Sequence, residues 1–386
     1  MAEAPLLSII MATHNRRDVL LNTLGEVRLA ARAVEPYEII VVDNRSRDGT
    51  AEAVREHHPQ VKLIRSPGNL GSCAKALGVE KATGRYILFL DDDSYPRPGS
   101  IERMIAYLEA DAFLGAVGFH VHLPDGSCEC SALPNVFVGC GVGFRAGMLR
   151  DIGSLDPSLF MQAEEYDLAF RMISAGWRVD RFPDCHVEHL KTPNARKSAR
   201  RVYYDTRNNL IVLYRYVPAS HFGIYRHDWN QRYRWIAADN GHRVTHLRGL
   251  ISGHACGIPD RRLYRPLRLD AETIETLFRF DEIHERMNAV RQGGARRVVL
   301  AEFGKNIYPF FRAARQCGLE ILAVADDGFA APKRRYRNVP ILPERDALDL
   351  KPDAVVVSNT SPVHAELAAK RLGTATDVPV HAWFTP

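Results

Sequence analysis

Three consecutive carboxylates, Asp91, Asp92 and Asp93, follow the apolar run YILFL that ends at Leu90. At neutral pH, close carboxylates at a partly shielded surface repel one another by about 1 kcal/mol or more for each pair. A divalent cation would remove this repulsion, because Mg2+ and Mn2+ take oxygen ligands and are commonly held by one or two carboxylates together with substrate phosphates. The alternative is a solvated acidic turn in which Asp93 or Ser94 caps a following helix.

A second group of carboxylates lies in the segment AEEYDLAFR. On a helix, Glu164, Asp167 and Arg171 share one face, and Glu165 points about 100° away from them. The spacing predicts an Asp167–Arg171 ion pair, which on a helix surface contributes a few tenths of a kcal/mol. A carboxylate in the first turn of this helix would be favoured in its ionised form by the helix dipole.

Short apolar runs alternate with helix-length segments in the first third of the chain. None of these runs alternates apolar with polar residues, so each is expected to be covered on both faces, as in a parallel sheet. The order strand, helix, strand predicts an α/β fold with a doubly wound sheet, whose ligands lie beyond the carboxyl ends of the strands. Asp43 and the acidic loop occupy such ends. The expected strands are 6–12, 37–42, 61–65 and 86–90, and the expected helices are 19–31, 50–57 and 72–83.

The sequence predicts three regions: an N-terminal domain over 1–215, a helical connecting region over 216–292, and a smaller Rossmann-like α/β domain over 293–386. The last region carries one glycine, Gly304, where a dinucleotide fingerprint needs three. Asp326 follows the next expected strand, where an acid would bind a ribose. We expect a structural or partner-binding module rather than a live cofactor site.

Five segments, in order, resemble the inverting glycosyltransferases of family two with the GT-A fold, including their rhamnosyltransferase-like members. The resemblance covers roughly residues 6–215 and implies a doubly wound, mixed or parallel sheet. The segments are SIIMATHNR, IIVVDNRSRDGT, SPGNLGSCAKALGVEKATGRYILFLDDDSYP, NVFVGCGVGFRAGMLRDIGSLDPSLFMQAEEYDLAFRMISAGWRVDRFPDCHVEH and YYDTRNNLIVLYRY.

The resemblance implies that a Mn2+ or Mg2+ ion held by Asp91 and Asp93 bridges the protein to the diphosphate of a nucleotide-sugar donor. Asp43 would contact the nucleotide base, with the Thr13 loop beside it; the alternative for Asp43 is a turn or helix-capping residue. The donor-binding residues implied by the matching motifs are Thr13, Asn15, Asp43, Asn69, Gly71, Asp91 and Asp92.

The resemblance also implies a catalytic base on the helix after Ala163. The family commonly has Glu-Asp there, whereas this chain has Glu164-Glu165, so the matching base is Glu165, one methylene longer, with Glu164 as the second candidate. His189 matches a histidine that some GT-A enzymes place on the metal, which would favour manganese over magnesium. His186, three residues earlier, would point to the opposite face of a strand.

A basic segment follows His189. It is interpreted either as a solvated loop or as a lid over the diphosphate or a phosphate-bearing acceptor. The residues proposed for this lid are Arg196, Lys197, Arg200 and Arg201.

The composition is that of an ordinary globular protein, with a net charge of +5 that suits an anionic ligand or membrane surface and does not by itself indicate nucleic acid. Seven irregularly spaced cysteines predict reduced thiols in the cytoplasm. Cys128 and Cys130, without a second ligand pair, are not expected to bind zinc. No stretch is long enough to cross a bilayer; a location at the inner face of the membrane, a peripheral membrane contact and a homodimer are open interpretations.

The leading functional interpretation is a metal-dependent, inverting, hexosyltransferase-type enzyme of cell-envelope polysaccharide biosynthesis. It would move a sugar from a nucleotide-diphosphate sugar to a hydroxyl acceptor on a glycan, lipid-linked or natural-product molecule. One alternative is an NAD-dependent sugar oxidoreductase acting through the C-terminal domain. Another is a glycosyltransferase-like scaffold without catalysis, for which the Glu-Glu substitution is the support.

Overall fold

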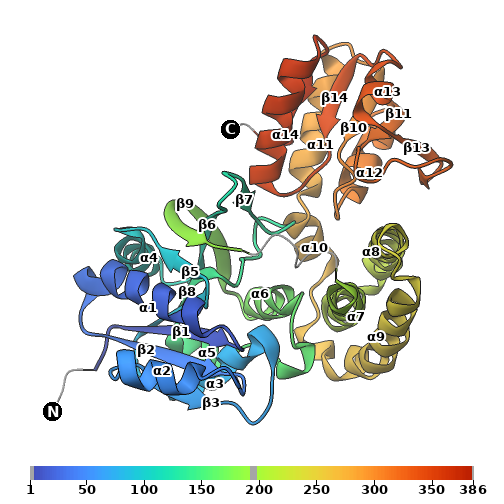
Figure 1. Cartoon of the computed structure of the whole chain (residues 1–386). Helices are drawn as coiled ribbons and strands as arrows, with labels where there is room; N and C mark the ends of the chain where they lie inside the picture. The colour runs from blue at the N-terminus through green and yellow to red at the C-terminus, as the bar shows by residue number, and fades with distance from the viewer. Residues whose placement is uncertain (1–3, 192–197, 385–386) are drawn as a thin grey trace. The chain divides into compact units, whose positions relative to one another are not determined.

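The chain forms two compact units, each with its own sheet and hydrophobic core (Figure 1). The computed structural model describes residues 4–191 and 198–384. The first unit comprises Met1–Ser131, Asn135–Tyr216 and Val244–Arg268, and the second comprises Ala132–Pro134, Val217–Arg243 and Leu269–Pro386.

The first unit is built on a mixed sheet. Its strands lie in the order β3-β2-β1-β4-β8-β6-β9-β5, and β7 pairs with β6. The four strands expected from the sequence are parallel neighbours in this sheet, whereas β8 is antiparallel to both β4 and β6. The α/β class with a mixed sheet is therefore confirmed. The strands are β1 (Leu7–Thr13), β2 (Tyr37–Asp43), β3 (Lys62–Arg65), β4 (Tyr86–Asp91), β5 (Ser94–Pro96), β6 (Leu114–His122), β7 (Cys128–Glu129), β8 (Gly141–Arg145) and β9 (Arg178–His189).

Helices cover both faces of the parallel half of this sheet. Leu20 and Leu24 of α1 share a buried core with Ile9 of β1. On the other face, Gly78 of α3 approaches β1 so closely that a Cβ atom there would lie 2.4 Å from Cγ2 of Ile10. The helices of this unit are α1 (Arg17–Ala31), α2 (Thr50–His57), α3 (Lys75–Lys81), α4 (Ser100–Ala110), α5 (Ala146–Ile152), α6 (Glu164–Ser174), α7 (Ala199–Tyr216) and α9 (Arg243–Leu263), with 3-10 turns η1 (Arg32–Val34), η2 (Gly71–Ala74), η3 (Pro157–Leu159) and η5 (Arg265–Leu267).

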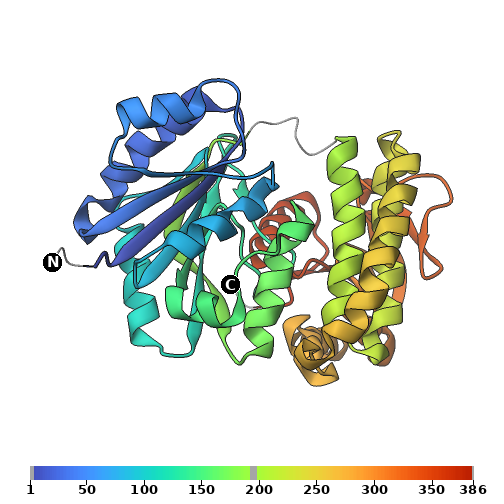
Figure 2. The ribbon, with the colours of Figure 1, turned by 90° about the horizontal axis from the view of Figure 1, so that it is seen from below.

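Two long helices of the first unit, α7 and α9, run side by side (Figure 2). Gly249, Gly253 and Gly257 repeat every four residues on α9 and face α7. A Cβ atom at Gly257 would lie 2.2 Å from the ring of Tyr214. The glycine spacing therefore allows the two backbones to approach closely.

The second unit has a six-stranded sheet in the order β12-β13-β11-β10-β14-β15, in which all pairs except β12–β13 are parallel. Its strands are β10 (Arg297–Ala301), β11 (Glu320–Ala325), β12 (Arg335–Tyr336), β13 (Val339–Leu342), β14 (Ala354–Val357) and β15 (Val380–His381). Its helices are α8 (Ala219–Asp239), α10 (Ala271–Leu277), α11 (Phe280–Gln292), α12 (Tyr308–Gln316), α13 (Glu344–Leu348) and α14 (Pro362–Ala375).

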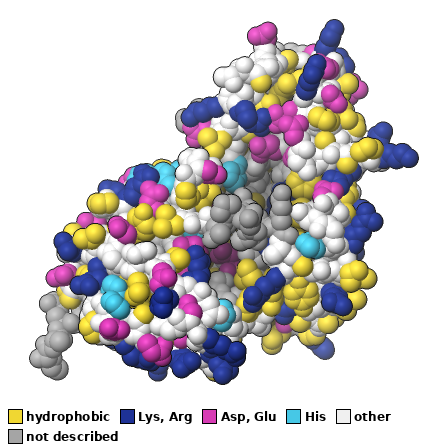
Figure 3. Space-filling model, viewed as in Figure 1, with side chains coloured by type: hydrophobic (Ala, Val, Ile, Leu, Met, Phe, Trp, Pro, Cys, Tyr) yellow, Lys and Arg dark blue, Asp and Glu magenta, His cyan; other side chains and the backbone are white. Residues whose placement is uncertain are grey.

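All seven cysteines are free thiols in the structure. Within residues 4–191 and 198–384, no helix is long and apolar enough to cross a membrane. On the face shown in Figure 3, lysine and arginine side chains are interspersed with acidic ones, so the small net positive charge is not gathered there into one field.

Candidate functional site

The acidic loop joins two strands. Asp91 is the last residue of β4, and β5 begins at Ser94 and pairs antiparallel with the end of β9. The expectation that Asp93 or Ser94 caps a helix is therefore wrong. The next helix, α4, starts only at Ser100, after Gly99 in the cap position. The loop is instead held at the edge where β4, β5 and β9 meet.

Basic side chains of the protein itself neutralise much of this loop. Arg16 lies 2.9 Å from Asp92 and 2.7 Å from Asp93. Lys75, whose side chain is 2% exposed, donates to Asp91 at 2.5 Å and to the Gly139 carbonyl at 2.8 Å. The sequence analysis did not single out Arg16, which follows β1, or Lys75, which begins α3.

The local environment separates the acidities of two loop carboxyls. Burial raises the pKa of Asp92 to about 6, although Arg16 and a 2.7 Å hydrogen bond from Thr13 favour its ionised form. Burial also opposes ionisation of Asp93, but the hydrogen bond from His189 and the charge of Arg16 lower its pKa to about 2. Asp93 is therefore the firmly anionic member of this pair.

His189, at the end of β9, lies between two carboxylates. Its Nε2 is 3.2 Å from Asp93 Oδ1, and its Nδ1 is 3.1 Å from Glu129 Oε2. Burial alone would lower the pKa of His189, but hydrogen bonds with Asp93, Cys140 and Glu129 raise it to about 12. Glu129, on the short strand β7, was not anticipated from the sequence.

The donor atoms around the acidic loop fit a small divalent cation. Ligand atoms of Asp91, Cys140 and His189 all lie within 4.8 Å of one another. A cation bound at about 2.0–2.2 Å holds neighbouring ligand atoms roughly 3 Å apart, and His189 Nε2 and Asp93 Oδ1 are 3.2 Å apart. The group offers one carboxylate oxygen, one imidazole nitrogen and the Cys140 thiol sulfur, and Asp93 adjoins it through its contact with His189. His189 would bind a cation only after losing the proton that it shares with Asp93.

The loops after β1 and β2 border a cavity of about 350 Å³. Asn15 and Asn69, both expected at a donor site, line it together with His14, Asn44, Arg45, Arg47 and Gly68. Asn15 binds the neighbouring loop twice, because its amide donates to Ser46 Oγ and its side-chain oxygen accepts from the amide of Arg47.

Asp43 combines a turn contact with an unsatisfied oxygen. Its Oδ1 accepts a hydrogen bond from the Ser46 amide at 2.8 Å, which is the turn contact that the alternative interpretation described. Its Oδ2 is buried and has no hydrogen-bond partner among the described residues. Buried carboxylate oxygens are rarely left unpaired, so this oxygen is suited to a donor group on a ligand.

Position 71 requires glycine because of its backbone conformation and because the Phe160 carbonyl lies close to it. Its φ is +62°, and a Cβ atom there would lie 2.1 Å from the carbonyl oxygen of Phe160. Its amide donates to Asn69 Oδ1 at 2.9 Å. The Asn-x-Gly segment therefore sets the chain path into η2 and α3, which carries Lys75.

Two glutamates begin α6. Glu164 is buried, hydrogen-bonds to Ser72, and keeps its Oε2 without a partner among the described residues. Glu165 is half-buried and lies against Gly139, where a Cβ atom would be 3.4 Å from its Oε1. Burial and the nearby charge of Glu164 raise the pKa of Glu165 well above its ordinary value.

The predicted Asp167–Arg171 ion pair is confirmed, at 3.0 Å. The pair is buried rather than on the helix surface, because Asp167 also accepts hydrogen bonds at 2.7 Å from Arg215 and from the Tyr216 hydroxyl. Asp167 is thus a structural anchor between α6 and α7.

Of the proposed lid, Arg196 and Lys197 lie outside the described residues. The guanidinium of Arg200 stacks 4.5 Å from the centre of the Phe160 ring. Arg201 pairs at 3.4 Å with an aspartate one turn later in α7. Both described arginines therefore have protein partners in this state.

In the second unit, Asp326 is engaged by the backbone. Its carboxylate accepts from the amides of Phe303, Gly328 and Phe329 at 2.7–3.0 Å. Gly304 is pressed against the chain, since a Cβ atom would lie 2.6 Å from the Ser358 carbonyl oxygen. These contacts give both residues structural roles and leave the ribose-binding role without support.

Comparisons with known proteins find similarity to glycosyltransferases. Residues 8–130 match the family model described as Glycosyl transferase family 2. The chain is 25% identical over 236 residues to N-acetylglucosaminyl-diphospho-decaprenol L-rhamnosyltransferase of Mycobacterium tuberculosis (strain ATCC 25618 / H37Rv), covering 48% of this chain and 76% of that protein. It is 29% identical over 106 residues to Glycosyltransferase AglE of Haloferax volcanii, covering 26% of this chain and 35% of that protein.

Among solved structures, the chain is similar to mannosyltransferase PcManGT from Pyrobaculum calidifontis in complex with GDP-Man and Mn2+, with a TM-score of 0.47 and 16% identity. The match covers 69% of this chain and 85% of that one. The chain covers less than two thirds of the length of several curated relatives that it matches, from 35% to 60%.

Proposed function

We propose that the chain transfers a sugar from a nucleotide-diphosphate sugar to a hydroxyl group of an acceptor, with inversion at the anomeric carbon, because residues 8–130 match the model of Glycosyl transferase family 2. One observation carries this proposal: the acidic loop and the glutamates that begin α6 meet around Lys75. Lys75 contacts Asp91 and the Gly139 carbonyl, and Gly139 lies against Glu165. The two carboxylate groups that such a reaction needs are therefore neighbours.

Donor binding is assigned to the strand-end loops. The cavity beside Asn15 and Asn69 has a volume in the range of small-molecule sites, and the unpaired Oδ2 of Asp43 is suited to an N–H group of a base. Asp91, Asp93 and His189 would hold a divalent cation, with manganese favoured by the imidazole ligand. When bound, this ion would supply positive charge to the diphosphate as it leaves.

Glu165 is assigned as the base that takes the proton from the acceptor hydroxyl. It is half-buried and faces Gly139, whereas Glu164 is buried and bonded to Ser72. The surroundings raise the pKa of Glu165, and a carboxylate with a raised pKa is a stronger proton acceptor once ionised. Lys75 favours its ionised form.

The acceptor is proposed to be a lipid-linked or polymeric molecule of the cell envelope, reached from the cytoplasmic side. The support is the similarity to a rhamnosyltransferase whose name specifies a diphospho-decaprenol acceptor.

The test incubates the purified chain with Mn2+ and a panel of nucleotide sugars, and measures release of the nucleoside diphosphate. Glu165→Gln is expected to keep donor affinity while lowering turnover by roughly 10²–10⁴-fold, and Glu164→Gln serves as the matched control one residue away. Loss of turnover only in Glu164→Gln would identify Glu164, rather than Glu165, as the base. Absence of release with every donor, in the presence of detectable nucleotide binding, would favour a scaffold without catalysis.

A further inference from the structure

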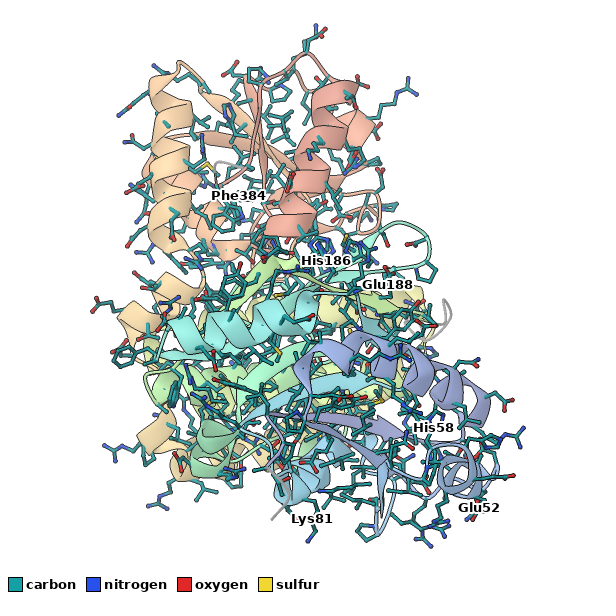
Figure 4. The ribbon with its side chains drawn as sticks, turned by 90° about the vertical axis from the view of Figure 1, so that its left-hand side faces the viewer. Glu52, His58, Lys81, His186, Glu188 and Phe384 are labelled. Atoms are coloured by element: carbon teal, nitrogen blue, oxygen red, sulfur yellow. The ribbon has the colours of Figure 1, made fainter. Side chains whose placement is uncertain are left out.

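A second group of metal-ligating side chains lies on three neighbouring strands of the first unit. β6 pairs with β9 so that His120 faces His186, and β6 pairs with β7 so that His122 faces Cys128. Residues two apart on a strand point to the same face, so His120 and His122 both join this group. Figure 4 labels His186 here, with Glu188 two residues further along β9.

The group differs from the site around the acidic loop. Cys128 and Glu129 are successive residues of β7, and alternation sends their side chains to opposite faces. Glu129 contacts His189, whereas Cys128 contacts His120. His186 and His189 are three apart on β9 and likewise contact different groups.

The ligand atoms are close enough for one ion. Those of His120, His122 and Cys128 all lie within 4.8 Å of one another. His120 Nε2 is 3.0 Å from Cys128 Sγ, and His122 Nε2 is 3.0 Å from His186 Nδ1. In a tetrahedral zinc site with Zn–N of about 2.0–2.1 Å and Zn–S of about 2.3 Å, ligand atoms are roughly 3.3–3.7 Å apart. His186 lies outside this group of three and contacts only His122 in it, so its imidazole would have to move to complete the tetrahedron.

We propose that His120, His122, His186 and Cys128 form a structural Zn2+ site, which is separate from the acidic-loop site. Three imidazoles with one thiolate are a donor set that favours Zn2+ over Mg2+ or Ca2+. Four protein ligands leave no open coordination position, as in structural rather than catalytic zinc sites. Binding replaces the thiol proton of Cys128, which is released to solvent.

A nearby charge also bears on this site. Arg181 opposes binding, because its guanidinium lies 3.1 Å from His120 Nδ1. That contact has to open, since a histidine that ligates through Nε2 carries its proton on Nδ1.

The site would have a mechanical consequence for the hairpin. β7 contains only Cys128 and Glu129, and two residues provide little ladder hydrogen bonding. A zinc ion bound to Cys128 would fix the strand, and with it the Glu129 carboxylate that hydrogen-bonds to His189.

Cobalt substitution provides the test, because a thiolate bound to Co2+ gives an intense near-ultraviolet charge-transfer absorption. The full chain is titrated with Co2+ and then with Zn2+, which should displace it. The absorption is expected in the unsubstituted protein and in Cys130→Ser, and it is expected to disappear in Cys128→Ser. Cys130 is the matched control, because it is a free, half-buried thiol on the same segment. Survival of the absorption in Cys128→Ser, or its absence from the unsubstituted protein, would overturn the proposal.

Cys140 belongs to the acidic-loop group, so a variant at Cys140 tests whether the absorption comes from that group instead. Cys140→Ser is expected to keep the absorption, and its loss there would assign the thiolate to the other group and refute the proposal. A second readout does not depend on the thiol. His122→Gln should weaken Zn2+ binding, measured by competition with a chromophoric chelator, by more than the ~10–100-fold typical of losing an outer-shell partner. Unchanged affinity in a variant with unchanged circular dichroism would also refute it.

Discussion

Removing the Asp167 carboxylate is expected to destabilise the first unit strongly. The side chain is 1% exposed, and its two oxygens accept hydrogen bonds from Arg171, Arg215 and the Tyr216 hydroxyl. Asp167→Ala would leave two buried guanidinium groups without this partner. Breaking a buried pair from one side costs about 3–5 kcal/mol, because the remaining charge stays in a poorly solvated place.

The remaining partners set where in that range the cost falls. Arg215 keeps ion pairs with Asp156 at 2.9 Å and Asp260 at 2.7 Å. Arg171 keeps hydrogen bonds to backbone carbonyls of the segment before α6. We therefore expect a loss near the lower end, about 3 kcal/mol, which for a domain of 150–250 residues corresponds to a Tm lower by roughly 6–12 °C.

The assay is thermal unfolding followed by far-ultraviolet circular dichroism. The matched control is Glu52→Ala, which breaks an exposed acid–base pair with Arg55 on α2 of the same unit. That change should alter stability by no more than about 0.5 kcal/mol. If Asp167→Ala lowered the Tm no more than Glu52→Ala, the reasoning that burial makes this pair essential would be wrong.

Three further changes test other parts of the first unit. Gly71→Ala should lower the free energy of unfolding, measured in urea, by more than about 1 kcal/mol, because φ is +62° and the Cβ would lie 2.1 Å from a carbonyl oxygen. Gly25→Ala should not lower it, because Gly25 lies inside α1 with open space around it. Lys75→Met should destabilise the acidic loop and abolish donor turnover, whereas Lys81→Met, exposed on the same helix, should leave both unchanged. Glu38→Gln should lower stability at neutral pH, because the hydrogen bond from Lys62 and others outweigh burial and lower the pKa of Glu38 to about 2. That contribution is present above the unfolded pKa of about 4.3 and is lost as pH falls towards 2, so the difference in Tm between the two proteins should narrow between about pH 5 and 3; a constant difference would contradict the assignment.

The parallel half of the first sheet was predictable because its strands are continuous apolar runs. The structure places β1, β2, β3 and β4 within one residue of the expected bounds, and α2 spans the expected 50–57. The antiparallel half was not located; two of its strands, β6 and β8, carry glycines that weaken a strand pattern. Gly143 of β8 shows why: a Cβ atom there would lie 2.0 Å from Met104 Sδ on α4, a packing requirement that only the folded chain reveals.

The rule that ligands lie at the carboxyl ends of parallel strands correctly predicted which loops are neighbours. It did not predict the side chains from other elements that contact these loops. Residues after β1, β2 and β4 meet at one edge, since parallel strands share their carboxyl ends. Lys75 was missed because a buried lysine is identified by its distant partners, here Asp91 and the Gly139 carbonyl, rather than by local spacing. Glu129 was missed for the same reason, since it meets His189 across 60 residues of chain.

The charge balance of the acidic loop links the fold to the proposed chemistry. Arg16 holds both Asp92 and Asp93, yet its side chain is 35% exposed, whereas Lys75 is 2% exposed. A buried lysine cannot leave Asp91 without leaving an uncompensated charge. Arg16 is partly exposed and can exchange partners, but Asp92 and Asp93 are each 6% exposed, so their charges would need a replacement cation. An arriving diphosphate offers Arg16 the oxygen geometry that a guanidinium binds in a bidentate manner. Release of Asp93 by Arg16 would then free a carboxylate for a cation at the moment that the anionic donor arrives, so donor and metal are expected to bind cooperatively.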